Sequence, residues 1–352
     1  MAAIDTPTGD PINEDWLARV DEPVIDPDVP VIDPHHHLFP PPMGYEAEHL
    51  LADVGSGHRV VATVFTDAWH GYRTDGPAHL RPVGETEWVT GLGEASDRAG
   101  NATRICAAIT SGGDLTLPAP LVDELLDAHI EAGKGRFAGI RIHPFVDLDP
   151  ATATMKPVAE PEKVVTNPAL LAGMAAMARR GLALDLAPYH THLPYIARLA
   201  EQVPELVIVI DHLAPLADYN SPPAPMDKLM SDWRRGIDAL APNAKVHMKL
   251  GGLANKFMDH TLPQFRRLRT QPKPPSSEEL AELYRPMVTY AIETLGPSRC
   301  MFESNFPVDK STTSYRVLWN AFKRLARAYS PDESHALLMG TAARVYQVTG
   351  LA

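Results

Sequence analysis

Short apolar runs alternate with longer amphipathic segments along the whole chain. The short runs have the length and composition of buried strands, and the longer segments repeat apolar residues at helical spacing. The predicted strands are Val29–Ile32, Val60–Thr66, Ile105–Thr110, Phe137–His143, Leu182–Leu186, Leu206–Asp211, Val246–Leu250 and Cys300–Glu303. The predicted helices are Glu85–Ala99, Leu121–Ala132, Pro168–Arg180, Leu193–Gln202, Met226–Leu240, Ser277–Leu295, Thr312–Tyr329 and Pro331–Gln347.

This alternation predicts a parallel sheet, and eight strands in 352 residues favour a (β/α)8 TIM barrel. The alternative, a doubly wound open sheet, usually carries a glycine-rich phosphate loop after its first strand. Here that place holds His35, His36 and His37, followed by three prolines. We therefore predict an N-terminal arm over residues 1–28 and one barrel domain over residues 29–352. The long proline-rich loops are predicted at Asp147–Pro168, Ala214–Pro225 and Thr270–Ser276.

Composition narrows the class of partner. The net charge of -12 argues against a nucleic-acid or anionic-membrane partner, and no apolar run approaches the ~20 residues of a membrane span. The first residues show no basic or apolar signal region, and the only two cysteines, Cys106 and Cys300, lie in apolar runs. These features predict a cytoplasmic protein that acts on a small molecule. The N-terminal arm either wraps the barrel or pairs with another subunit, so a homodimer is one expectation.

Polar residues gather where the predicted strands end, which is where TIM barrels place their active sites. His35 and His37 share one face of the first strand, about 6.6 Å apart, whereas His36 faces the other way. Polar groups also end the later strands, at Arg141, His143, Asp185, Tyr189, His190, His192, Asp211, His212, His247, Lys249, Glu303 and Asn305. A lone histidine in such a place is more often structural than a ligand. Strands one, five, six, seven and eight all end with ionisable or amide groups, and this shared pattern predicts an active site.

At this point the chain resembles the amidohydrolase-related TIM-barrel hydrolases, called amidohydrolase 2. That family is similar in architecture to the lactonases that act on sugar lactones and pyrone dicarboxylates, and to the metal-dependent aromatic decarboxylases. The resemblance covers about Val31 to Gln347. The matching segments are Asp33-Pro34-His35-His36-His37, Gly139-Ile140-Arg141, Tyr189-His190-Thr191-His192-Leu193-Pro194, Val209-Ile210-Asp211-His212-Leu213, Lys249-Leu250-Gly251-Gly252 and Cys300-Met301-Phe302-Glu303-Ser304-Asn305-Phe306-Pro307.

The resemblance implies a role for each group. His35 and His37 match metal ligands, and His190 matches a further histidine of the site, with His192 as the second choice. His212 matches a histidine that polarises substrate or transfers a proton. Arg141 would bind a substrate carboxylate through its planar fork. The expected substrate-binding residues are Arg141, His192 and Tyr189, and the expected metal ligands are His35, His37 and His190.

The chain departs from the family at Asn305, where the family more often has an aspartate that serves as ligand and general base. An amide carries no charge and accepts no proton at neutral pH. A divalent metal, zinc first, and a metal-free site therefore both stay open. Glu303 is a substitute base two residues earlier, although it is also expected to pair with Lys249. Lys249 would then stabilise a developing oxyanion.

The leading expectation is hydrolysis of a lactone, or a similar cyclic carbonyl compound, that carries a carboxylate. The expected catalytic residues are His212, Glu303, Asn305 and Lys249. One alternative is metal-dependent, non-oxidative decarboxylation of an aromatic acid, and the loss of the aspartate counts against it. A second alternative is a non-catalytic small-molecule binder on the same barrel, which only Asn305 favours.

Overall fold

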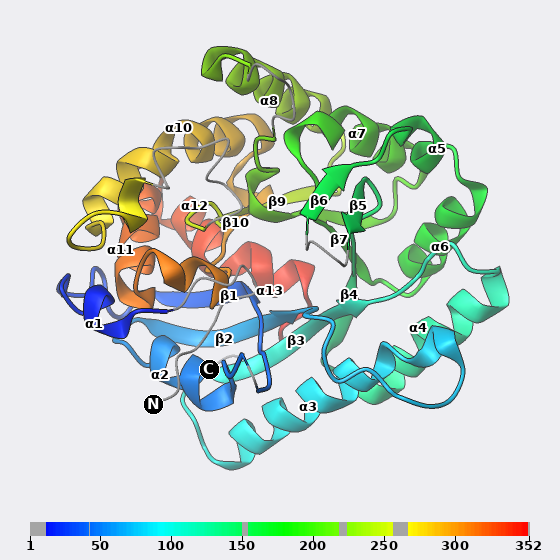
Figure 1. The fold of residues 1–352 in the computed structure, drawn as a ribbon, viewed down its shortest axis with the longest axis horizontal. Helices are drawn as coiled ribbons and strands as arrows, with labels where there is room; N and C mark the ends of the chain where they lie inside the picture. The colour runs from blue at the N-terminus through cyan, green and yellow to red at the C-terminus, as the bar shows by residue number, and fades with distance from the viewer. Residues whose placement is uncertain (1–11, 42, 150–153, 218–223, 256–266, 351–352) are drawn as a thin grey trace.

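Eight parallel strands form the centre of the molecule, and helices surround them (Figure 1). The computed structural model describes residues 12–41, 43–149, 154–217, 224–255 and 267–350. The strands are β1 (Pro30–His36), β2 (Arg59–Thr66), β3 (Arg104–Gly112), β4 (Phe137–Ile142), β7 (Ala183–Leu186), β8 (Val207–Ile210), β9 (Val246–Leu250) and β10 (Cys300–Phe302), paired in that order. The predicted (β/α)8 barrel is confirmed, with every expected strand in place.

The ring closes between β1 and the segment that follows β10. The His37 amide donates to the Phe306 carbonyl at 2.7 Å, and the Asn305 amide donates to the His35 carbonyl at 2.9 Å. The strand β1 also runs four residues beyond its predicted end at Ile32. His35 is therefore fixed by the main-chain pairing of the barrel, and His37 and Asn305 lie at its rim.

The predicted helices are present with small shifts at their ends. They are α3 (Val83–Arg98), α4 (Ala119–Gly133), α6 (Pro168–Arg179), α7 (Leu193–Gln202), α8 (Met226–Leu240), α10 (Ser277–Leu295) and α11 (Tyr315–Ala326). The last predicted helix is divided into α12 (Pro331–His335), a π-helical turn η7 (Ala336–Gly340) and α13 (Thr341–Val345). Further short elements are α1 (Glu14–Leu17), α2 (Ala47–Val54), η1 (Ala78–Leu80), η2 (His190–His192), η3 (Asp211–Leu213), η5 (Pro297–Arg299) and η6 (Val308–Ser311). Among the described residues, no helix is both long and apolar enough to cross a membrane.

The first proline-rich segment holds more structure than expected. It contains an antiparallel pair, β5 (Val146–Asp149) with β6 (Thr154–Pro157), and a short helix α5 (Pro161–Val165). The expectation of a long loop over Asp147–Pro168 therefore missed two strands and a short helix. In the predicted loop after β8, residues 218–223 lie outside the described residues.

The described part of the predicted N-terminal arm lies against the outer helices of its own barrel. The Trp16 indole donates to the Gln271 carbonyl at 3.0 Å, and the Ile25 amide donates to the Asn320 side chain of α11 at 2.8 Å. Glu22 accepts from the Ser277 amide at the start of α10 at 2.8 Å. These contacts fit an arm that wraps the barrel. The homodimer stays a prediction.

Gly139 is a point of very close packing between β4 and β7. It lies opposite Ala183 in the parallel ladder. A Cβ atom at residue 139 would lie 2.1 Å from the Ala183 carbonyl oxygen, which the ladder holds in place. Only glycine fits there without a shift of one strand.

We expect Gly139→Ala to lower the free energy of unfolding by about 1–3 kcal/mol or more, because the added methyl group overpacks a rigid ladder. The matched control is Gly91→Ala, inside α3, where a Cβ atom meets nothing within 4 Å. That change should raise stability by about 0.5–1 kcal/mol. Urea unfolding of both variants measures the difference, and equal effects would contradict the packing argument.

Candidate active site

The side chains of His35 and His37 on the first strand lie in contact, as expected. The Nε2 atoms of His35 and His37 lie 3.1 Å apart. His37 Nδ1 lies 2.9 Å from the Thr66 carbonyl oxygen, which only accepts, so the ring proton of neutral His37 is on Nδ1. Its Nε2 lone pair therefore faces His35. His36 points elsewhere, with Nε2 2.9 Å from the Thr63 hydroxyl, and burial lowers the pKa of His36 to about 3.

Lys249 lies at the centre of a buried cluster of charges. Its ammonium is 2.7 Å from Asp185 Oδ2, 3.0 Å from Asp211 Oδ1 and 3.1 Å from His35 Nδ1. Burial opposes the charge, but Asp185 and Asp211 raise the pKa of Lys249, so the ammonium persists. Tyr346 donates to Asp185 at 2.8 Å. The pairing expected between Lys249 and Glu303 was wrong, since Lys249 contacts two other carboxylates.

Arg141 is held by two carboxylates. Its Nε donates to Asp211 Oδ2 at 2.8 Å, and one terminal nitrogen donates to Asp67 Oδ1 at 3.2 Å. Burial alone would lower the pKa of Arg141, yet the charges of Asp211 and Asp67 raise it above its usual value. Conversely, despite burial, Lys249 and Arg141 hold the pKa of Asp211 well below its usual range. The guanidinium charge is thus already compensated inside the protein.

His212 and Glu303 form a dyad at the floor of the cavity. His212 Nδ1 lies 2.7 Å from Glu303 Oε1, and the His212 amide donates to the same oxygen at 3.1 Å. Despite burial, contacts with His212 and His35 lower the pKa of Glu303, so it is an acceptor. The Nδ1 atom must then carry the proton, which leaves the lone pair of neutral His212 on Nε2. Gly252 permits this arrangement, because a Cβ atom there would lie 2.0 Å from His212 Nδ1.

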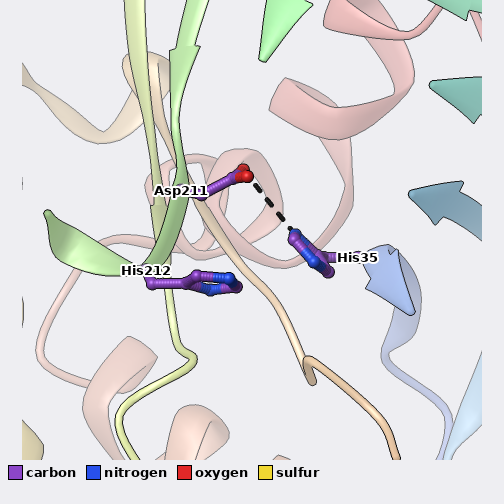
Figure 2. Close-up of side chains that lie close together, drawn as sticks. All are labelled: His35, Asp211 and His212. Carbon is purple, nitrogen blue, oxygen red and sulfur yellow. Dashed lines mark ion pairs between the residues drawn. The ribbon is translucent and has the colours of Figure 1, made fainter. Parts of the chain in front are cut away.

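Side chains of His35, Asp211 and His212 point toward one another from the ends of β1 and β8 (Figure 2). One ligand atom from each lies within 4.8 Å of the others. Oδ1 of Asp211 and Oε2 of the neighbouring Glu303 are buried and accept no well-aligned hydrogen bond from the described residues. Two imidazole nitrogens on one tetrahedral zinc lie about 3.3 Å apart, close to the separation of the His35 and His37 Nε2 atoms. The residues present therefore fit a divalent cation.

Asn305 is fixed by a carboxylate in the loop that follows it. Its Nδ2 donates to Asp309 Oδ1 at 2.9 Å, and Asn255 donates to the same oxygen at 2.8 Å. A carboxylate only accepts hydrogen bonds, so the Asn305 atom that faces Asp309 must be Nδ2. The amide oxygen Oδ1 of Asn305 therefore points away from Asp309. Burial raises the pKa of Asp309 to about 6 against these hydrogen bonds. Asn305 lines the cavity.

A cavity of about 360 Å³ opens beside these groups. Of the residues predicted for the site, those that line it are His37, Arg141, Tyr189, His212 and Asn305. His35, Lys249 and Glu303 lie beneath it, fully buried. These eight side chains thus belong to one site.

His190 and His192 are placed differently from the expectation. Neither lines the cavity, and neither belongs to the cluster of possible ligands found among the described residues. His190 Nδ1 accepts from the Ala217 amide at 3.2 Å, and His192 Nδ1 accepts from the Tyr189 amide at 3.1 Å. In the neutral rings the proton is then on Nε2, which leaves that atom no lone pair for a metal.

Three aspartates were missing from the predicted site. Asp67, Asp185 and Asp211 are fully or almost fully buried and bind Arg141 and Lys249. A signal was present in the sequence, because an aspartate inside an apolar strand needs a buried cation. Strand register places Asp185 opposite Arg141 in the β4–β7 pairing, close to both cations, although its carboxylate contacts Lys249.

We expect Asn305→Asp to destabilise the protein by about 1–3 kcal/mol at pH 8, because two buried carboxylates would then face each other at hydrogen-bond distance. Such a pair shares a proton and has a raised pKa in the folded state. Its stability is therefore present at low pH and is lost as the pH rises through that value, so the loss should be smaller at pH 5.

The double variant Asn305→Asp, Asp309→Asn is the control, since it restores an amide beside a carboxylate. It should recover part of the lost stability, because Asn255 also donates to Asp309. Urea unfolding at the two pH values measures both effects. A loss independent of pH, or no recovery in the double variant, would contradict this account.

Comparison with known proteins agrees with this geometry. The amidohydrolase family model matches residues 32–348. An uncharacterized protein of Sinorhizobium fredii is 30% identical over 91% of this chain and 99% of its own. The L-fucono-1,5-lactonase of Burkholderia ambifaria is 26% identical over 52% of this chain and 56% of its own.

A solved amidohydrolase of Burkholderia multivorans, crystallised with bound zinc, has a TM-score of 0.63 and 22% identity. The match covers 91% of this chain and 99% of that one. The family model spans the chain from β1 to the last helix, and the solved structure has the same fold. The chain therefore belongs to the amidohydrolase family.

Proposed function

We propose that this protein is a hydrolase that opens a cyclic ester by attack of water. The observation that carries the proposal is the dyad of His212 and Glu303 at the cavity, with 2.7 Å between Nδ1 and Oε1. A buried carboxylate on Nδ1 orients the imidazole and leaves Nε2 as a base, which is the arrangement general-base catalysis needs. The partial match to a lactonase supports an ester as substrate.

In this mechanism His212 takes the proton of water, and Glu303 stabilises the imidazolium that forms. The hydroxide adds to the lactone carbonyl carbon, and the ring carbon–oxygen bond then breaks. His212 returns the proton to the leaving alkoxide, which gives a hydroxy acid. Asn305 Oδ1 is available to accept a hydrogen bond from the attacking water, since its Nδ2 is engaged by Asp309.

Negative charge develops on the carbonyl oxygen, and two cations lie nearby. Arg141 uses two of its five N–H groups on Asp67 and Asp211, so others are available to a substrate oxygen. Lys249 contributes its positive charge from beneath, and His35 Nδ1 lies 2.9 Å from Glu303 Oε2, to which it can donate. Fixed donors of this kind stabilise an oxyanion at little reorganisation cost.

The site also fits a divalent metal, with zinc the first expectation. His35 and His37 would hold it through Nε2, and Asp211 and His212 lie within reach of His35. Such an ion would supply Lewis-acid polarisation of the carbonyl. Charge supports this assignment, because four buried carboxylates of the described site, Asp67, Asp185, Asp211 and Glu303, lie around two buried cations there, Arg141 and Lys249.

We expect His212→Ala to lower kcat on a hydrolysed lactone by about 10²–10⁴-fold, because the general base is lost. The matched control is His79→Ala, which removes a surface histidine that pairs with Glu124. Circular dichroism checks that both variants fold. Near-normal turnover by His212→Ala would rule out the dyad as the base. Release of carbon dioxide from an aromatic acid by the wild-type protein, without uptake of water, would instead favour decarboxylation.

Metal content gives a test that does not depend on activity. We expect about one zinc per chain in the purified protein, and loss of that zinc in His37→Ala. His190→Ala should keep its metal, because the His190 Nδ1 accepts from the main chain and the ring lies outside the cavity. Elemental analysis of the three proteins decides between this ligand set and one that includes His190.

A further inference from the structure

We propose that the site selects an uncharged, flat, largely apolar ring compound, and that Trp69 is the surface on which the ring stacks. This inference rests on the proposed ester hydrolysis and names the class of ester. It differs from the expectation that Arg141 binds a substrate carboxylate. Three observations carry it, and they concern the placement of Trp69, the lining of the cavity and the charges at its floor.

The side chain of Trp69 is exposed at the cavity rather than buried. It is 51% exposed and lines the cavity, and its ring centroid lies 5.6 Å from that of His143. Its φ is 58°, in the left-handed region that costs a bulky residue free energy. The buried Glu85 of α3 holds the segment there, since it accepts from the amides of Ala68 at 2.9 Å and His70 at 3.0 Å.

Much of the cavity lining is apolar. Besides Trp69, its lining includes Phe39, Met43, Pro188, Pro215 and Val308. The volume of about 360 Å³ is more than twice that of an engineered cavity of about 150 Å³ that binds benzene. A compound with two fused rings therefore fits, with its carbonyl group toward the polar floor.

The floor has no net positive charge for an anionic substrate, because Arg141, Lys249 and the proposed divalent metal would together only balance its four buried carboxylates. Arg141 is the only lysine or arginine among the described residues that line the cavity. Its guanidinium donates to Asp211 and Asp67, and its charge is offset by theirs. A substrate carboxylate would approach those aspartates without a free counter-charge, which costs binding energy. A substrate rich in hydroxyl groups is also disfavoured, because the apolar walls leave buried hydroxyls without partners.

The first experiment compares three lactones at equal concentration. Dihydrocoumarin is uncharged and bicyclic, its ring-carboxylated derivative adds one negative charge, and glucono-1,5-lactone is a polyol. We expect kcat/KM for dihydrocoumarin to exceed the other two by about 100-fold or more, which is the scale of one unpaired buried charge or several unpaired hydroxyls.

The second experiment isolates Trp69. Trp69→Ala should lower kcat/KM for dihydrocoumarin about tenfold or more, whereas Trp69→Phe should recover most of it. The loss in Trp69→Ala should be several-fold smaller for δ-valerolactone, which has no second ring to stack. The control is Ile130→Ala on α4, the other exposed large apolar residue in the described part of the chain, at 40% exposure. That variant should behave as wild type on both substrates.

A binding measurement separates this inference from the proposed reaction. The carbocyclic analogue 2-tetralone cannot be hydrolysed, and it should quench tryptophan fluorescence in the wild-type protein but not in Trp69→Ala. Binding of 2-tetralone without turnover of any lactone would overturn the hydrolysis and leave the ring site standing. Preferred turnover of the carboxylated lactone or the polyol, or equal turnover of dihydrocoumarin by Trp69→Ala, would overturn the ring site and leave hydrolysis standing.

Discussion

The buried ammonium of Lys249 is the interaction on which the rest of the site depends. It lies on β9 and contacts Asp185 on β7, Asp211 at the end of β8 and His35 on β1, at 2.7, 3.0 and 3.1 Å. One cation thus joins four elements of the barrel at the end where the cavity opens. Removing either partner of such a buried pair leaves an uncompensated charge, which typically costs about 3–5 kcal/mol. The network therefore constrains the register of the strands as well as the position of the catalytic groups.

The same network determines which charges the substrate meets. Asp211 is shared between Lys249 and Arg141, so the two cations are linked through one carboxylate. Arg141 is consequently a donor of hydrogen bonds rather than a free positive charge. The excess of carboxylates over cations beneath the cavity favours a cation above them, and it disfavours an anion. The proposed divalent metal and the proposed uncharged substrate both follow from this one charge balance.

The sequence predicted the barrel well because its strands and helices have strong, unmixed periodicity. All eight barrel strands were located, and β9 matched at both ends. The hairpin of β5 and β6 was missed because prolines mask the alternation that identifies strands. In the site, eight of the ten predicted residues come together. His190 and His192 do not, because a short 3-10 turn directs their Nδ1 atoms to main-chain amides, and motif position alone does not report that.

Buried carboxylates remain close to Asn305, which stands where an aspartate was expected. Glu303 lies two residues earlier, and its buried oxygens contact His212 and His35. Asn305 meanwhile is tied to Asp309, so a second carboxylate at residue 305 would face like charge. A negative group at the rim would also touch the substrate directly, whereas Glu303 acts through the His212 imidazole. In the proposed mechanism the proton acceptor is an imidazole at the surface of the cavity, which suits water activation beside an uncharged, apolar substrate better than an exposed carboxylate does.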